Sequence, residues 1–303
     1  MMNKIIFLIC TFIMPYLSVG QITSIPDINF ETALINLGYD SILDGEVNTQ
    51  NISNIDTLNL MYKNISDLTG IEDFTNLQVL HCDQNNLTTL DVSSNTNLFK
   101  LTCCYNQLNN LLLNNNIRSL ECYYNNLISL DLSSCYNLEV LKCSFNYLTE
   151  IDVSQNPYLL LLGCAHNHIT NLDVSNNLYL YLLSCSNNLL TSLNVKNGNN
   201  HNFGLGFPCG LGFYAINNPD LSCITVDDPN WATQNWLVDS NQIDTQHYFT
   251  MNCEQITSIE ENSTTQKVQK ILDMMGRETN MDYNIPLFFI YDDGKIEKRI
   301  ILK

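Results

Sequence analysis

The chain has 303 residues, is 45% hydrophobic and carries a formal net charge of −18. Residues 21–261 hold 25 acidic and five basic side chains, a net charge of −20, whereas residues 262–303 hold six acids and seven bases. Binding to phosphates relies on Lys and Arg, so the acidic body argues against a nucleic-acid partner. The change in charge balance indicates a second module at the C-terminus.

The first twenty residues, "MMNKIIFLICTFIMPYLSVG", have a lysine, an apolar stretch and small residues at Ser18 and Gly20. This order predicts a signal peptide over residues 1–20, cleaved between Gly20 and Gln21. The apolar part is too short and wrongly flanked for a membrane-spanning helix, so no transmembrane segment is expected. Lipidation of Cys10 is an alternative, disfavoured because Ile9 precedes it where a small residue is needed. We expect a protein that is secreted or attached to the outer cell surface.

Residues 21–53 follow with "IPDINFETALINLGYD", which opens on Pro26 and Asp27. Apolar residues then recur at helical spacing, and this pattern predicts a helix. A stack of repeats needs such a cover at its end, so we interpret the segment as an N-terminal cap. The apolar positions of the expected helix are Phe30, Ala33, Leu34 and Leu37.

Residues 54–200 repeat one short motif, Leu-x-Cys-x-x-Asn, six times. Steps of 21, 19, 21, 21 and 21 residues separate the cysteines, and a fixed period of this size predicts a solenoid. Each copy has too few apolar residues for a core of its own and must bury them against its neighbours. The six cysteines are Cys82, Cys103, Cys122, Cys143, Cys164 and Cys185.

The full pattern L-x-x-L-x-C-x-x-N-x-L resembles the leucine-rich repeat. The return segment "LDVSxN" resembles the short repeats of secreted Bacteroidetes proteins, and residues 21–53 resemble the caps that precede such repeats in flavobacterial proteins. The resemblance implies a mainly β and irregular solenoid. Its coils would form a right-handed superhelix with a parallel sheet on the concave side.

The repeat cysteines are predicted to be free thiols, although exported proteins meet oxidising compartments. Neighbouring parallel strands lie ~4.8 Å apart, a distance that a disulfide could bridge. Equivalent side chains point the same way, however, and a free cysteine packs well as a small apolar residue. A linear column also does not offer the tetrahedral set of ligands that zinc needs.

A row of rings lies two places after the cysteine position in successive copies. With strands ~4.8 Å apart, such rings would form a ladder on the concave face, suited to binding a protein or glycan ligand. The alternative is that the rings only stack on one another and stabilise the sheet. The predicted binding residues are Tyr62, Tyr105, Tyr124, Phe145 and His166, with Tyr123 beside them, and Gln84 and Asn187 complete the row.

No catalytic residues are predicted, because no nucleophile or carboxylate pair has a defined partner in the sequence. An aspartate recurs after the leucines of the return segments. Calcium binding by this column is an alternative, but hydrogen bonding to the adjacent turn is the commoner use of such a residue. We therefore expect neither a metal nor a cofactor. The column consists of Asp91, Asp131, Asp152 and Asp173.

Residues 201–255 are predicted to hold an insertion and the C-terminal cap. The glycine-rich "FGLGFPCGLGF" departs from the repeat, and "NNPDLSCITVDDPNWATQNW" keeps a last Leu221-x-Cys223 turn before the period ends. Cys223 and Cys253 flank this region, and a disulfide between them would staple the cap.

Residues 256–303 end in alternating apolar residues, a glycine turn "YDDG" and "KRIILK". This tail predicts a small β module. It resembles part of the C-terminal sorting domain of the Bacteroidetes type IX secretion system, which implies that machinery as a partner.

The sequence thus favours a secreted or surface-attached repeat protein that binds a protein or glycan through its concave face, without catalysis. A structural surface component without a specific ligand is the first alternative, and an enzyme is the second. The row of rings distinguishes a binding protein from a structural component, because a structural component without a ligand has no need to keep rings exposed.

Overall fold

The computed structural model describes residues 20–203, 212–253, 268–273, 276–279, 286–292 and 294–300. The predicted signal peptide, apart from Gly20, and residues 204–211 of the predicted insertion lie outside this range. The chain divides into two compact units, Met1–Met251 and Asn252–Lys303. Each is described by itself.

The N-terminal cap contains the predicted helix, which Asp27 begins. One carboxylate oxygen of Asp27 accepts hydrogen bonds from the backbone N–H groups of Asn29 (2.8 Å) and Phe30 (3.0 Å), and these bonds cap the helix. The other oxygen accepts the backbone N–H of Ser66 at 2.8 Å, so Asp27 also joins the cap to the first coil. Phe30 is buried, whereas Leu37, which the sequence placed at helical spacing, is 45% exposed and follows the end of the helix at Asn36. The elements are β1 (Ile22–Ser24), α1 (Ile28–Asn36), β2 (Glu46–Asn48), antiparallel to β1, and α2 (Thr49–Ile52).

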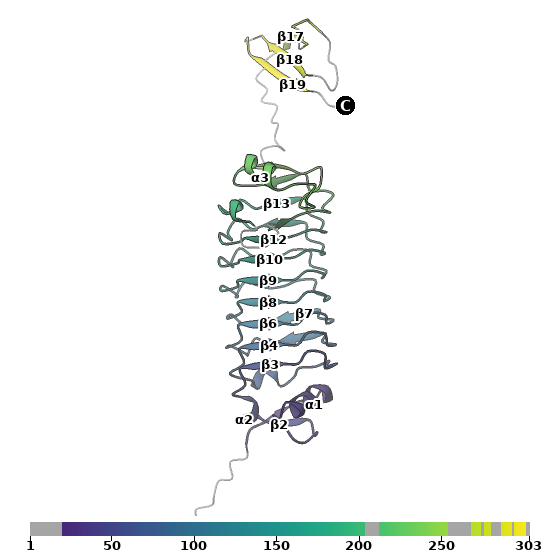
Figure 1. The fold of residues 1–303 in the computed structure, drawn as a ribbon, viewed down its shortest axis with the longest axis vertical. Helices are drawn as coiled ribbons and strands as arrows, with labels where there is room; N and C mark the ends of the chain where they lie inside the picture. The colour runs from purple at the N-terminus through teal and green to yellow at the C-terminus, as the bar shows by residue number, and fades with distance from the viewer. Residues whose placement is uncertain are drawn as a thin grey trace, which may run out of the picture. The chain divides into compact units, whose positions relative to one another are not determined.

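The coils stack so that one strand from each joins a parallel sheet, as Figure 1 shows for β3 to β12. Each strand is short. Its buried residue, a leucine in every strand but β14, where it is Phe213, is in register with the equivalent residues of the adjacent coils. Within the described residues the sheet has eight strands. They are β3 (Thr57–Asn59), β4 (Val79–His81), β6 (Lys100–Thr102), β8 (Ser119–Glu121), β9 (Val140–Lys142), β10 (Leu161–Gly163), β12 (Leu182–Ser184) and β14 (Phe213–Tyr214).

The return segments also form short parallel strands, on the other side of the core. β5 (Thr89–Asp91) pairs with β7 (Asn110–Leu112). A second group runs in the order β11 (Asn171–Asp173), β13 (Ser192–Asn194), β15 (Cys223–Thr225) and β16 (Tyr248–Thr250). The 3₁₀ helices are η1 (Ile71–Asp73) and η2 (Asn200–Asn202).

One continuous apolar core runs through the stack, from the N-terminal cap to the C-terminal one. The repeat leucines and all six repeat cysteines contribute to it and are fully buried. Burial of this kind is the main favourable term in folding, and here neighbouring coils supply it to each other. The predicted solenoid is confirmed.

The C-terminal cap closes the stack with α3 (Pro229–Asn235), which begins after Asp228. Trp236 follows the helix, is buried, and stacks on Phe213 with ring centroids 4.1 Å apart. Cys223 and Cys253 are both disulfide-bonded.

The second unit contains a small antiparallel sheet of three strands among its described residues, in the order β17, β18, β19. Leu287, Phe289 and Tyr291 are its buried side chains. The Tyr291 hydroxyl donates to Glu297 Oε2 at 2.8 Å. The bounds are β17 (Val268–Leu272), β18 (Pro286–Tyr291) and β19 (Ile296–Ile300).

Candidate binding surface

The row of rings does not lie on the strands, as the sequence had suggested, but in the turn that leaves each strand. Phe145, for example, lies three residues beyond the end of β9. The row residues all have positive φ values between 54° and 59°, a left-handed conformation that is uncommon outside glycine. These residues are Tyr62, Gln84, Tyr105, Tyr124, Phe145, His166 and Asn187.

An asparagine follows every residue of the row except Tyr62, and its side chain, mostly buried, holds this turn in place. Asn146 Oδ1 accepts the backbone N–H of Leu127 at 3.0 Å, and its Nδ2 donates to the carbonyls of Cys122 (3.0 Å) and Cys143 (3.1 Å). Buried backbone groups need such partners. A left-handed conformation costs roughly 1–2 kcal/mol for a residue with a side chain, and these hydrogen bonds help to offset it.

The rings stack face to face along the row and form a ladder. Ring centroids are 4.5 Å apart between Tyr105 and Tyr124, 4.1 Å between Tyr124 and Phe145, and 4.1 Å between Phe145 and His166. Their planes differ by 8–12°. The rings therefore stack on one another, and their inner faces are not open to a sugar ring.

The ladder instead exposes its ring edges. Tyr105 is 46% exposed, Tyr124 39% and Phe145 37%. Beyond Tyr105 the row continues with Gln84, whose Nε2 donates to the Tyr62 hydroxyl at 2.9 Å. We call Tyr105, Tyr124, Phe145 and His166 the ring ladder.

Tyr123 supports the ladder from the side. Its ring meets Tyr105 edge to face at 5.5 Å and Tyr124 at 6.0 Å. Burial, together with the nearby Cys104 thiol, raises the pKa of Tyr123 to about 12. Tyr123 is therefore a neutral phenol that packs against the ladder.

A groove of about 400 Å³ runs beside the ladder. Tyr124, Phe145 and His166 of the ladder line it, together with Tyr147. Tyr147 is exposed and stacks on His168 at 5.9 Å, so a second, shorter row of rings follows the first. The structure thus brings most of the predicted binding residues together, but as ridges and a groove rather than as a flat sheet surface.

A polar cluster on the concave sheet is the arrangement most similar to a catalytic one. His81 Nδ1 lies 2.8 Å from the Thr102 hydroxyl, which donates to Asp83, and Asp83 also accepts the backbone N–H of Cys104 at 2.8 Å. Burial and the Asp83 charge raise the pKa of the Cys104 thiol well above its usual range. Since the thiolate is the nucleophile, Cys104 is unreactive here. The cluster orders the sheet.

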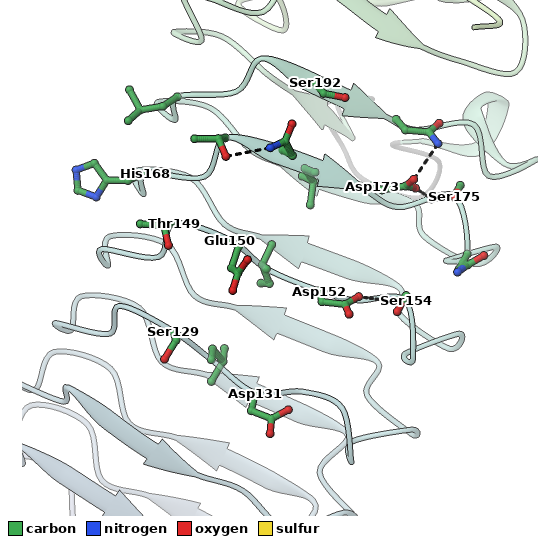
Figure 2. A pocket seen from close by; sticks show the side chains of 18 residues that line it. Ser129, Asp131, Thr149, Glu150, Asp152, Ser154, His168, Asp173, Ser175 and Ser192 are labelled. Atoms are coloured by element: carbon green, nitrogen blue, oxygen red, sulfur yellow. Dashed lines mark hydrogen bonds between the residues drawn. The ribbon is translucent and has the colours of Figure 1, made fainter. Parts of the chain in front are cut away.

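A hollow of about 1080 Å³ lies over the return strands, and Figure 2 shows Asp131, Asp152 and Asp173 along it, one from each of three coils. Hydrogen bonds from Ser133 lower the pKa of Asp131, and those from Ser154 lower that of Asp152. The carboxylates therefore accept hydrogen bonds within their own turns, which is the use expected from the sequence. The part of the chain that the structure describes contains no group of three His, Cys, Asp or Glu residues that could hold a metal ion.

The repeat cysteines are free and buried, as predicted. Burial raises the pKa of Cys122 and Cys164 to about 12 and holds the pKa of Cys103, Cys143 and Cys185 well above the usual value. They act as apolar packing residues.

No helix in the described part of the chain is long and apolar enough to cross a membrane.

No protein-family model and no curated protein matches the chain. Solved structures do match it. The functional domain of InlJ from Listeria monocytogenes, which includes a cysteine ladder, has 26% identity and a TM-score of 0.37, over 76% of this chain and 61% of that one. Internalin C2 from Listeria monocytogenes has 19% identity and a TM-score of 0.48, over 69% of this chain and 99% of that one. A leucine-rich repeat protein of Leptospira interrogans has 19% identity and a TM-score of 0.42, over 65% and 62%. The chain spans less than two thirds of the first and third of these structures.

The fold itself follows from the coils. Each coil buries two apolar residues at the strand of one parallel sheet, a leucine followed by a cysteine in the six repeats. In most coils a buried asparagine closes the turn after the strand. The repeats form a leucine-rich repeat solenoid.

Proposed function

We propose that this chain is an exported repeat protein that binds a partner protein through the edges of its ring ladder. The observation that carries the proposal is a run of exposed rings fixed in place by stacking at 4.1–4.5 Å. Aromatic residues supply much of the energy of protein interfaces. Rings that are already ordered lose little further side-chain entropy on binding.

A protein suits this surface better than a glycan does. Sugar rings stack on aromatic faces, and the inner faces of this ladder are covered by neighbouring rings. Ring edges, the hydroxyls of Tyr105 and Tyr124 and the groove beside them offer apolar contact with a few polar groups. This combination is typical of protein contacts.

Export is proposed from the sequence. The order of charged, apolar and small residues in 1–20 supports a signal peptide, with cleavage between Gly20 and Gln21. The likeness of residues 256–303 to a type IX sorting domain supports delivery to the outer surface or the medium.

The test compares the full chain with a ladder variant, Tyr124→Ser with Phe145→Ser, as bait for the envelope and secreted proteins of the producing cells. The matched control is Tyr158→Ser with Tyr179→Ser, a second exposed stacked pair whose centroids are 6.4 Å apart. We expect at least one protein that is retained by the wild type and the control and lost from the ladder variant. Identical sets of bound proteins for all three baits, each shown to be folded, would contradict the proposal.

A further inference from the structure

A second groove lies between the end of α1 and the first coil. Its volume is about 510 Å³. Tyr62, which begins the row of rings, forms part of its wall, so the groove adjoins the candidate binding surface. We call it the α1 groove. It is lined by Ala33, Asn36, Leu37, Asn59, Met61, Tyr62 and Lys63.

On the helical wall of the α1 groove, the last carbonyls of α1 already accept hydrogen bonds. Ala33 O accepts from Leu37 N at 3.1 Å, Ile35 O from Gly38 N at 2.9 Å and Leu34 O from Tyr39 N at 3.0 Å. The backbone there makes little further demand for a polar partner. This wall consists of the Ala33 methyl group, the exposed Leu37 side chain and the exposed, polar side chain of Asn36.

The opposite wall contains a break in the asparagine column. Lys63 occupies the place that a buried asparagine takes in the later coils, and it is exposed. The turn there has two left-handed residues, Tyr62 and Asn64, each with φ of 59°. No carboxylate of the described residues forms an ion pair with Lys63, whereas Lys142 and Arg118 have Glu121 and Glu139 as partners.

From these walls we propose that the α1 groove receives the C-terminal residue of a partner polypeptide. An apolar side chain would lie against Leu37, Met61 and Tyr62, and the terminal carboxylate would lie at Lys63. Lys63 is the one charged residue that lines the groove. The complementary ligand is therefore a single apolar group that carries one negative charge.

This inference rests on the proposed function, since it names the part of a partner that enters one subsite. It can nevertheless be tested without the partner, because small probes can bind directly to the residues that line the α1 groove. Failure of the ladder variant test and failure of the groove test are therefore distinguishable.

The test uses the full chain, labelled with ¹³C at the methionine methyl groups, and two small probes. N-acetyl-L-leucine has the apolar side chain and the carboxylate, and N-acetyl-L-leucinamide has the same side chain without the charge. The Met61 methyl signal is assigned from a Met61→Leu variant. We expect N-acetyl-L-leucine to shift this signal saturably and to bind more tightly than the amide by between about two- and fivefold, the range of an exposed ion pair.

Lys63→Gln removes the charge and should abolish the preference for the acid, while the amide should bind as before. Lys196→Gln, at another exposed lysine without an ion-pair partner among the described residues, is the matched control and should change neither affinity. N-acetylglycine, which lacks the apolar side chain, should bind more weakly than N-acetyl-L-leucine. Equal affinities of the acid and the amide for the wild type, or no saturable shift of the Met61 signal, would overturn the proposal.

Discussion

Asn85 Oδ1 lies 3.0 Å from the backbone nitrogen of Ile65, which belongs to the preceding coil, and accepts its hydrogen bond. The Nδ2 group of Asn85 donates at 2.8 Å to Leu60 in that coil and at 3.0 Å to Cys82 in its own. One buried carboxamide thus joins two coils at the turn where the ring row lies.

The asparagine column should therefore be costly to remove. We expect Asn146→Ala to lower the free energy of unfolding by about 3 kcal/mol, because it leaves buried backbone groups without partners. Urea denaturation measures the change. Asn126→Ala is the control, since Asn126 is exposed and makes a single 3.4 Å side-chain bond. A loss no larger for Asn146→Ala than for this control would refute the role of the column.

The left-handed turn predicts an unusual order of substitutions at Phe145, where φ is 56°. Both Ala and Gly remove the ring, but Gly adopts this conformation without a steric penalty. We expect Phe145→Gly to be more stable than Phe145→Ala by about 1 kcal/mol. Thermal and urea denaturation of the two variants give the comparison, and greater stability of the Ala variant would show that the conformation is wrong.

Stacking should contribute measurably to stability. Phe145 stacks on Tyr124 and on His166, whereas His166 stacks on Phe145. With about 0.5–1.5 kcal/mol for each aromatic pair, Phe145→Ala should destabilise the protein more than His166→Ala does. Equal losses in denaturation experiments would indicate that the rings only lie close together without net attraction.

The buried thiols should be inert in the folded protein. Because burial holds the pKa of Cys103, Cys143 and Cys185 well above the usual value, iodoacetamide at pH 8 should not modify them before unfolding. Mass spectrometry after labelling in native and denaturing buffer reports each site. Rapid modification of these three cysteines in native buffer would contradict the described packing.

His247 predicts a loss of stability at mildly acidic pH. Burial lowers its pKa below the usual 6.5, although Asp244 at 3.6 Å opposes the shift. The unfolded chain then binds a proton that the folded chain resists, so the contribution of His247 is present above pH 6.5 and is lost as the pH falls toward the lowered pKa. His247→Gln should reduce the fall in unfolding free energy between pH 7.5 and 5.5. An unchanged pH dependence in this variant would exclude His247 as its source.

Much of the fold was predictable because the leucine, cysteine and asparagine of the motif recur at a fixed spacing along the sequence. Leu80, Cys82 and Asn85 recur in step with their equivalents, and each takes the buried position that its chemistry suggested. The helix at residues 28–36 was predictable for the same reason, since Asp27 precedes an apolar pattern of helical spacing.

The geometry of the ring row was not predictable to the same degree. Tyr, Phe and His give no sign of a left-handed backbone, because hydrogen bonds from the asparagine column, including those of Asn85 to the turn of the preceding coil, hold these turns through contacts between coils. The available signal was Asn187 at the end of the row, a residue type that tolerates this conformation. The α1 groove could not be predicted because the spacing of Leu37 fits the helix. In the structure Leu37 lies beyond the end of the helix and is exposed, so it lines a groove.

The hydrogen bonds of the asparagine column run within one coil and to the coil before it, and this bears on how the protein can change over evolutionary time. Duplicating one internal coil would add one ring, one thiol and one carboxamide in register, with the two caps unaltered. Each coil gained or lost would therefore lengthen or shorten the ring row by one strand spacing. A partner of different length could be matched by gain or loss of a coil, without a new fold and without redesign of the existing contacts.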